Sequence, residues 1–183
     1  IGIDHTRAGI DVRTVFSFTK KKMAEALAVL QKVPGIEGCV LISTCNRMEL
    51  WASTDDGFPE EGLYEQLCKI KEADTSMYRP YFVFRKEREA VQHLFWLAGG
   101  LKSRILGEDQ IVTQVGEALS FAREQYATDS VMETLFRMAV TAAKKVKTEV
   151  ELSHTDNSVV RTAIDTLKEQ GQTFAGKKCM VIG

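Results

Sequence analysis

The sequence is poor in cysteine and proline and has no long apolar run, and each shortage excludes a class of protein. Its four cysteines (Cys39, Cys45, Cys68 and Cys179) form no Cys-x-x-Cys pair, which argues against a zinc ribbon or a redox dithiol. No apolar stretch approaches the roughly 18 residues that a membrane span needs, and no signal-peptide pattern opens the chain. We therefore expect a protein of the reducing cytoplasm, with no membrane contact and no metal site.

Charge and composition are those of an ordinary soluble protein. Lysine and arginine number 24 against 25 aspartates and glutamates, and 44% of the residues are hydrophobic. With only three prolines, the chain can bury a substantial core. A net charge of −1 means that any RNA-binding surface must be a local patch, for which the four basic residues of 137–147 are one candidate. A solvated helix face explains these residues equally well.

The pattern of apolar residues predicts an α+β fold. Short apolar segments at 1–4, 37–44, 47–54 and 81–84 are typical of strands, and amphipathic segments at 19–33 and 60–71 are typical of helices. We expect a small mixed or antiparallel sheet with helices packed on it. Three further helices are predicted at 87–98, 109–125 and 130–151. The expected buried stripe of the last comprises Val131, Leu135, Met138, Ala139, Ala142, Val146 and Val150.

The C-terminal part is predicted to begin a second domain. Residues 153–183 contain one more helix, at 159–169, and then the run Cys179-Met180-Val181-Ile182-Gly183. That run resembles the first strand of a Rossmann-type dinucleotide-binding unit, ending on the first glycine of its phosphate-binding loop. We therefore expect a domain at 1–152, followed by a linker helix and a truncated stub of a second domain. Because the chain starts at Ile1 rather than Met, we expect a few residues to precede it.

The most reactive stretch is Ser43-Thr44-Cys45-Asn46-Arg47-Met48-Glu49, which follows a four-residue apolar run typical of a buried strand. In extended backbone, side chains two residues apart lie on one face, so Cys45, Arg47 and Glu49 are expected side by side. A cation near a thiol favours the nucleophilic thiolate, and a guanidinium can bind a carboxylate through two hydrogen bonds. Spacing alone leaves an alternative: Cys45 as a small buried hydrophobe beside a solvated Arg47–Glu49 pair.

The same stretch resembles the active-site signature of the glutamyl-tRNA reductases, and further motifs of that family occur in order. This sequence departs from the family pattern in four places: Asp4 stands where Asn is usual, the glycine at 99–100 is doubled, Lys102 stands where Asp is usual, and Asp109 stands where Pro is usual. The matching segments are Gly2-Ile3-Asp4-His5, His93-Leu94-Phe95, and residues 98–103, 106–111 and 114–115. Together they cover essentially the whole chain.

The resemblance implies roles for particular residues. Cys45 is implied to be the nucleophile and His93 a general acid–base near it, although helical periodicity places His93 off the apolar stripe, where a half-exposed histidine is ordinary. Arg47 is the natural anchor for a carboxylate of the glutamyl group, with Glu49 fixing it or lying on the surface. The other implied substrate-binding residues are Thr44, Asn46, Ser103, Glu108, Asp109, Gln110 and Gln114. Gln110 and Gln114 lie one helical turn apart, so both can reach one ligand.

The resemblance also implies a reaction and its partners. Cys45 would attack the ester of glutamyl-tRNA, and hydride from NADPH would release glutamate-1-semialdehyde for tetrapyrrole (porphyrin and heme) synthesis. Gly183 would be the one residue present from the NADPH site, so this chain is expected to act at most as an esterase. The full-length form would be a homodimer and would work with glutamate-1-semialdehyde aminomutase.

Two other functions fit the residues alone. Cys45 can be structural in a non-catalytic module that binds tRNA or docks a partner, or it can serve a different thiol-dependent acyl transfer. Selective alkylation of Cys45 near neutral pH would exclude the first. Release of free glutamate from the tRNA would exclude the second.

Overall fold

The structure is a computed structural model that describes residues 1–59, 61–103, 106–108, 110–150 and 159–178. Its centre is a three-stranded antiparallel sheet in the order β1-β3-β2. The strands are β1 (Gly2–Asp4), β2 (Ile36–Ser43) and β3 (Arg47–Thr54). The expected strands at 37–44 and 47–54 are thus confirmed to within one residue, and the expected α+β class is confirmed with them.

The register of the sheet decides which side chains share a face. Glu49 of the central strand lies opposite Gly2 on one side and Ile42 on the other, and Arg47 lies opposite Asp4. Because residues alternate between faces, Arg47 and Glu49 point the same way. Residues 39–42 are all buried, as expected for a strand covered on both faces.

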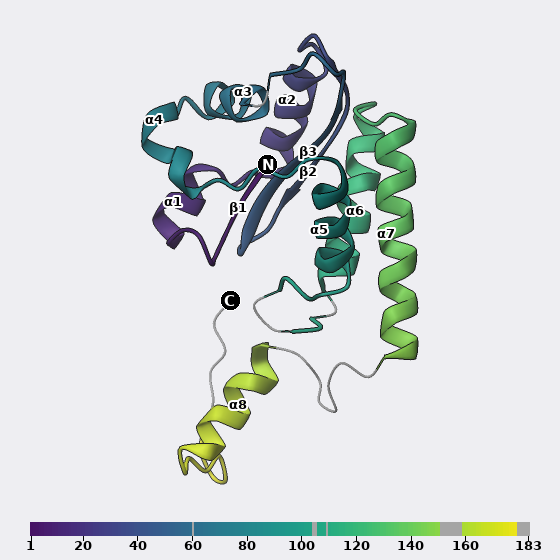
Figure 1. Cartoon of the computed structure of the whole chain (residues 1–183). Coiled ribbons are helices and arrows are strands. Elements are labelled where there is room, and N and C mark those ends of the chain that lie inside the picture. The colour runs from purple at the N-terminus through teal and green to yellow at the C-terminus, as the bar shows by residue number, and fades with distance from the viewer. Residues whose placement is uncertain (60, 104–105, 109, 151–158, 179–183) are drawn as a thin grey trace.

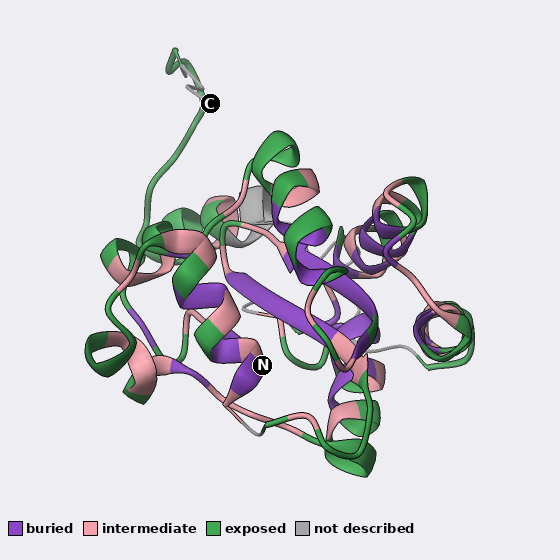
Figure 2. Ribbon diagram, turned by 90° about the horizontal axis from the view of Figure 1, so that it is seen from above, coloured by how far each residue is buried: buried purple, intermediate pink, exposed green. Residues whose placement is uncertain are grey.

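Helices cover both faces of the sheet. Figure 1 shows α2 (Lys20–Leu30) and α3 (Gly62–Lys71) on one side, and α5 (Glu87–Ala98), α6 (Gln110–Glu124) and α7 (Ser130–Glu149) on the other. Figure 2 shows the buried residues concentrated in the strands and on the helix faces turned toward them. Thr19 caps α2 through its hydroxyl, which accepts from the Lys22 N–H at 3.4 Å, as its position before the apolar stripe predicts.

Two short helices were not predicted. They are α1 (Ile10–Val15) and α4 (Thr75–Tyr78), and α4 continues into the 3₁₀ turn η1 (Arg79–Tyr81). The strand expected at 81–84 is wrong: within it only Val83 pairs with the sheet, in a single bridge to Gly2. Pro80 lies in η1 and has no N–H to give to a ladder, so the chain turns here before it can run alongside β1.

The buried stripe of α7 is rotated by about one residue from the predicted one. Met132, Phe136, Ala139 and Ala143 are buried, whereas the predicted Val131 and Met138 are 52% and 56% exposed. The reason is tertiary, since Phe136 is the largest side chain of the helix that is fully enclosed. A stripe judged only by apolar residue type could not distinguish the two alignments.

The chain after α7 contributes one more described element, α8 (Val159–Glu169). It agrees with the helix predicted there. The predicted strand at 179–183, with Gly183, lies outside the described residues. Within the described ranges, no helix is both long and apolar enough to span a membrane.

Candidate active site

The turn between β2 and β3 carries Cys45 and is held by its neighbours. The Thr44 hydroxyl accepts hydrogen bonds from the backbone N–H of Asn46 at 3.2 Å and of Arg47 at 3.3 Å, and the Asn46 carbonyl accepts from the His5 N–H at 3.0 Å. A threonine bonding to the backbone ahead of it is a common way to fix a tight turn. The Thr44 side chain is therefore fixed by the turn, and Asn46 is held through its backbone.

Cys45 is exposed at the tip of this turn. The alternative in which it is a small buried hydrophobe is therefore wrong. The prediction that Cys45, Arg47 and Glu49 follow one strand alternation also needs correction, because β2 ends at Ser43 and β3 begins at Arg47. The alternation holds for Arg47 and Glu49 and does not extend to Cys45.

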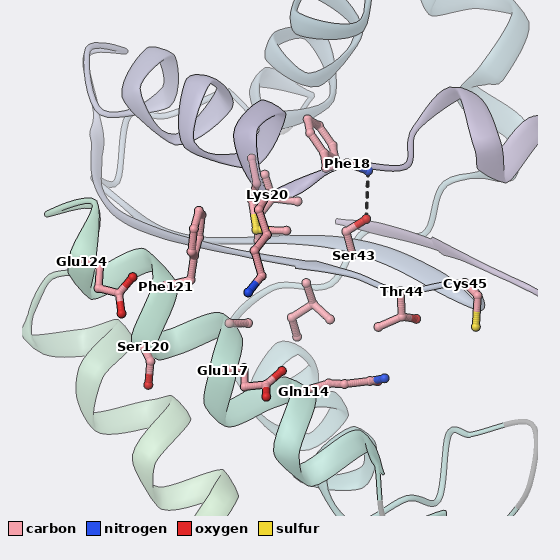
Figure 3. A pocket seen from close by; sticks show the side chains of 14 residues that line it. Phe18, Lys20, Ser43, Thr44, Cys45, Gln114, Glu117, Ser120, Phe121 and Glu124 are labelled. Carbon is pink, nitrogen blue, oxygen red and sulfur yellow. Dashed lines mark hydrogen bonds between the residues drawn. The ribbon is translucent and has the colours of Figure 1, made fainter. Parts of the chain in front are cut away.

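A cavity of about 480 Å³ begins at Cys45 and extends along the edge of β2, between α2 and α6. This volume is within the usual range for small-molecule sites. In Figure 3, Gln114 and Glu117 of α6 face Lys20 of α2 across the hollow, and Cys45 lies at one end of the strand. The cavity is thus open to the thiol, amphipathic, and large enough for an aminoacyl group.

Beside the turn, four side chains form a buried cluster on one face of β3. Arg47 donates from Nη1 to Glu49 Oε1 at 2.9 Å, and Trp51 donates from Nε1 to Glu49 Oε2 at 3.1 Å. His93 of α5 places Nε2 3.1 Å and 3.2 Å from the two carboxylate oxygens. Arg47 and Glu49 are only 3% and 5% exposed, so the surface-pair alternative for Glu49 is wrong.

The cluster keeps Glu49 ionised. Burial alone would raise the pKa of the Glu49 carboxyl, but the hydrogen bond and charge of His93, together with Arg47, outweigh burial and lower the pKa to about 2. A buried carboxylate with donors on both oxygens is a fixed negative group. It can hold a guanidinium in one orientation and has no spare proton near neutral pH to transfer.

His93 is 5% exposed, which corrects the expectation of a half-exposed helical histidine. Its ring lies parallel to the indole of Trp51, with centroids 5.8 Å apart and planes 12° apart. Its Nδ1 is buried and has no hydrogen-bond partner among the residues that the structure describes. The described contact of its other ring nitrogen, Nε2, is with Glu49, and neither His93 nor Arg47 lines the cavity that contains Cys45.

Arg47 also ties the strand to the segment after α5. Its Nη2 donates to the backbone carbonyl of Lys102. The bonds to Glu49 and Lys102 account for two of the five N–H groups of a guanidinium. Backbone groups at Gly100 and Gly107 close this segment, since the Gly107 N–H donates to the Gly100 carbonyl at 3.1 Å.

The remaining predicted substrate-binding residues lie around the start of α6. Ser103 and Glu108 are half-buried in the segment before it, Gln110 is exposed at its first turn, and Gln114 lines the cavity one turn later. The Glu108 carbonyl accepts from Nζ of Lys147 at 3.4 Å. Asp109 lies outside the described residues, as does Gly183.

Several residues that the structure places in the site, Glu117 among them, were missed from the sequence. Trp51 follows Glu49 by two positions, so the alternation that pairs Arg47 with Glu49 would have found it. Lys102 contributes a backbone carbonyl, for which the sequence carries no signal. Lys20 lines the cavity only because α2 packs beside β2.

The chain matches known proteins along nearly its whole length. The family model described as "Glutamyl-tRNAGlu reductase, N-terminal domain" matches residues 1–150. The glutamyl-tRNA reductase of Acetivibrio thermocellus is 45% identical over 186 residues, covering 100% of this chain and 54% of that protein. The glutamyl-tRNA reductase of Alkaliphilus oremlandii is 42% identical over 182 residues, with the same two shares.

A solved structure shows the same fold. The glutamyl-tRNA reductase of Methanopyrus kandleri superposes with a TM-score of 0.72 and 25% sequence identity, covering 92% of this chain and 39% of that one. This chain spans about half the length of the curated relatives it matches.

Proposed function

Because the chain belongs to the glutamyl-tRNA reductase family, and contains that family's N-terminal domain, we propose that Cys45 accepts the glutamyl group of glutamyl-tRNA. One observation carries the proposal. The exposed Cys45 thiol lies on a turn fixed by hydrogen bonds, at the end of a cavity of about 480 Å³, and Arg47, two residues later, is buried and held by Glu49. The alternative of a merely structural cysteine lacks support, because Cys45 packs in no core.

The proposed step is an acyl transfer. The Cys45 thiolate attacks the carbonyl carbon of the ester that joins glutamate to the terminal ribose of the tRNA. A C–S bond forms and the C–O bond breaks, so the ribose oxygen leaves with the tRNA and takes a proton from water. The product is a thioester on Cys45, whose carbonyl accepts nucleophiles or hydride more readily than the original ester.

Substrate recognition is assigned to the groups around the thiol. The remaining N–H groups of Arg47 bind a carboxylate of the glutamyl group, with the guanidinium oriented by Glu49. Thr44, Asn46 and Ser103 offer hydroxyl and amide groups nearby. Glu108, Gln110 and Gln114 lie around the start of α6, where Gln114 lines the cavity. Asp109 is proposed to bind substrate from the family resemblance alone.

His93 is proposed to act as a positioning residue rather than as the acid–base. Its Nε2 lies within hydrogen-bond distance of both oxygens of Glu49, and the residue is only 5% exposed. It therefore acts on the substrate through Glu49 and Arg47. A pH–rate profile that loses no limb in His93→Gln would support this assignment.

The rest of the reaction is proposed for the whole protein. NADPH would supply the hydride that reduces the thioester to glutamate-1-semialdehyde for porphyrin and heme synthesis, in the cytoplasm. The predicted contact to NADPH, Gly183, lies outside the described residues, and no step assigned to the described residues needs it. Homodimerisation and transfer of product to the aminomutase rest on the family resemblance.

The test is mass spectrometry of the protein mixed with glutamyl-tRNA in the absence of NADPH. The expected result is a glutamyl adduct on the peptide containing Cys45, followed by slow release of free glutamate. Cys45→Ser is the control and should carry no adduct. A folded wild-type sample that binds tRNA but forms no adduct would overturn the proposal and favour a non-catalytic tRNA-binding module.

A further inference from the structure

Trp51 contacts two members of the buried cluster through two different parts of its side chain. Its indole N–H donates to Glu49 Oε2 at 3.1 Å, and the face of its ring stacks on the His93 imidazole. The ring edge meets Phe136 of α7, with centroids 5.8 Å apart and planes 87° apart. Trp51 is 8% exposed, so water does not compete effectively for the N–H.

The two oxygens of Glu49 are held differently. Oε1 receives the Arg47 guanidinium at 2.9 Å, and Oε2 receives the Trp51 indole at 3.1 Å. His93 lies almost equally far from both, at 3.1 Å and 3.2 Å, so it does not favour one rotation of the carboxylate. The plane of the carboxylate is therefore set by the pair of donors at its two ends, Arg47 and Trp51.

This geometry makes the orientation of Arg47 depend on Trp51. A carboxylate anchored at both oxygens presents Oε1 in a fixed direction, and the guanidinium follows it because the ion pair is buried. Without the indole N–H, Glu49 can rotate toward His93, and Oε1 moves. The remaining N–H groups of Arg47 would then point less well at a substrate carboxylate.

We propose that Trp51 is a positioning and specificity-determining residue, which acts through Glu49 to aim Arg47 at the side-chain carboxylate of the glutamyl group. The proposal rests on the proposed function, since it presumes that Arg47 binds that carboxylate. It goes further by naming a residue, Trp51, that makes the protein discriminate between glutamyl and glutaminyl esters. A carboxylate offers two acceptor oxygens to a guanidinium, whereas a neutral amide offers one and presents an NH₂ donor in place of the other. Discrimination therefore depends on how well the guanidinium is aimed.

A packing role for Trp51 predicts a different outcome. If Trp51 only fills space against Phe136, truncating it lowers stability and slows every substrate by the same factor. If Trp51 positions Arg47, its loss slows glutamyl transfer selectively. The ratio of the two rates, rather than either rate alone, separates the two roles.

The experiment measures transfer to Cys45 from glutamyl-tRNA and from glutaminyl-tRNA, by mass spectrometry, for the wild-type chain and for Trp51→Phe. Phenylalanine keeps an aromatic ring against His93 and removes the N–H. The expected result is a roughly tenfold slower reaction with glutamyl-tRNA and a nearly unchanged one with glutaminyl-tRNA. An unchanged ratio in a folded Trp51→Phe protein would overturn the proposal.

Phe136→Leu is the matched control, because it removes the packing partner of Trp51 and leaves the N–H in place. It should lower stability and keep the wild-type ratio; a ratio that falls as far as in Trp51→Phe would assign the effect to packing and overturn the proposal. If Trp51→Phe does not fold, 3-benzothienylalanine at position 51 keeps the indole shape without the N–H and should give the same fall. A wild-type protein that reacts with neither ester overturns the proposed function, and this inference with it.

Discussion

Arg47 and Glu49 form an ion pair of 2.9 Å two positions apart on β3, and both side chains are almost completely withdrawn from water. Removing one partner of such a pair leaves an uncompensated buried charge, at a cost of about 3–5 kcal/mol. A pair of this kind stabilises a fold little compared with apolar side chains of similar volume. Its presence beside the thiol is better explained by the need to hold a guanidinium in one direction.

Arg47→Lys should therefore slow transfer to Cys45 strongly although the charge is kept. An ammonium cannot reproduce the planar array of N–H groups that reaches Glu49, Lys102 and a substrate carboxylate together. We expect a loss on the order of 2–4 kcal/mol in transition-state stabilisation, measured as kcat/KM with glutamyl-tRNA. Arg79→Lys is the control, since Arg79 makes a two-pronged pair with Glu61 at the surface. Near-normal turnover of Arg47→Lys would remove Arg47 from the role of carboxylate anchor.

Cys45→Ser should abolish transfer, because a serine hydroxyl is a far weaker nucleophile near neutral pH. Cys39→Ser and Cys68→Ser should retain it. Burial and Asp129 raise the pKa of the Cys39 thiol to about 12, and burial raises the pKa of Cys68. Iodoacetamide at pH 7.5 should accordingly label Cys45 well before Cys39 or Cys68. Cys179, predicted to be equally dispensable, lies outside the described residues.

Glu49 should make the protein acid-sensitive. Its pKa in the folded state, about 2, lies below its ordinary value of 4.5, so its ionised form stabilises the fold above pH 4.5. That contribution is lost as the pH falls from about 4.5 toward 2, and amounts to on the order of 3 kcal/mol. Urea unfolding at several pH values should show this slope in the wild type and a flatter one in Glu49→Gln. Equal slopes in the two proteins would mean that another group carries the acid sensitivity.

Gly100→Ala should damage the site more than the fold. Gly100 has φ +80°, and a Cβ there would lie 2.9 Å from the Cα of Gly107. The hydrogen bond between Gly107 and Gly100, which closes the segment that carries Lys102, would have to break or lengthen. We expect a cost of about 1–3 kcal/mol in stability and slower transfer to Cys45.

Gly116→Ala in α6 is the control, for which we expect the opposite sign. A Cβ there meets Val140 at 3.9 Å, so helix propensity should raise the free energy of unfolding by about 0.5–1 kcal/mol. Thermal unfolding and transfer rates of both variants would check these signs.

Much of this architecture could be predicted because local pattern and tertiary structure agree. The apolar run at 39–42 predicted a strand covered on both faces, and the polar residues after it predicted that the strand ends near Cys45, while the pattern alone left open whether the thiol is buried. Alternation correctly placed Arg47 and Glu49 on one face. Those signals lie within about ten residues of one another, where sequence reasoning is strong.

The failures have different origins. His93 is polar and lies off the apolar stripe of α5. The free-energy cost of burying it is offset by its hydrogen bond to Glu49, which lies 44 residues earlier in the chain. The face that α7 buries is chosen by Phe136 meeting Trp51, which no helical period reveals. Val83 reaches β1 for a single bridge because of a turn at Pro80. The first two failures come from long-range contacts, and the third comes from a local turn.

The hydrogen bond from the Gly107 N–H to the Gly100 carbonyl closes the base of the segment between the two glycines, of which residues 101–103 and 106 are described. Gly100 lies just after α5 and Gly107 lies shortly before α6, so this bond joins the ends of the two helices through backbone atoms and not through the side chains of the segment. Arg47 binds the segment through a main-chain carbonyl, so that contact survives almost any change of residue at position 102. The side chains at positions 101 and 102, both exposed, can therefore be replaced while the main-chain contact to Arg47 is kept, which makes these two positions suitable for introducing new side chains near the site.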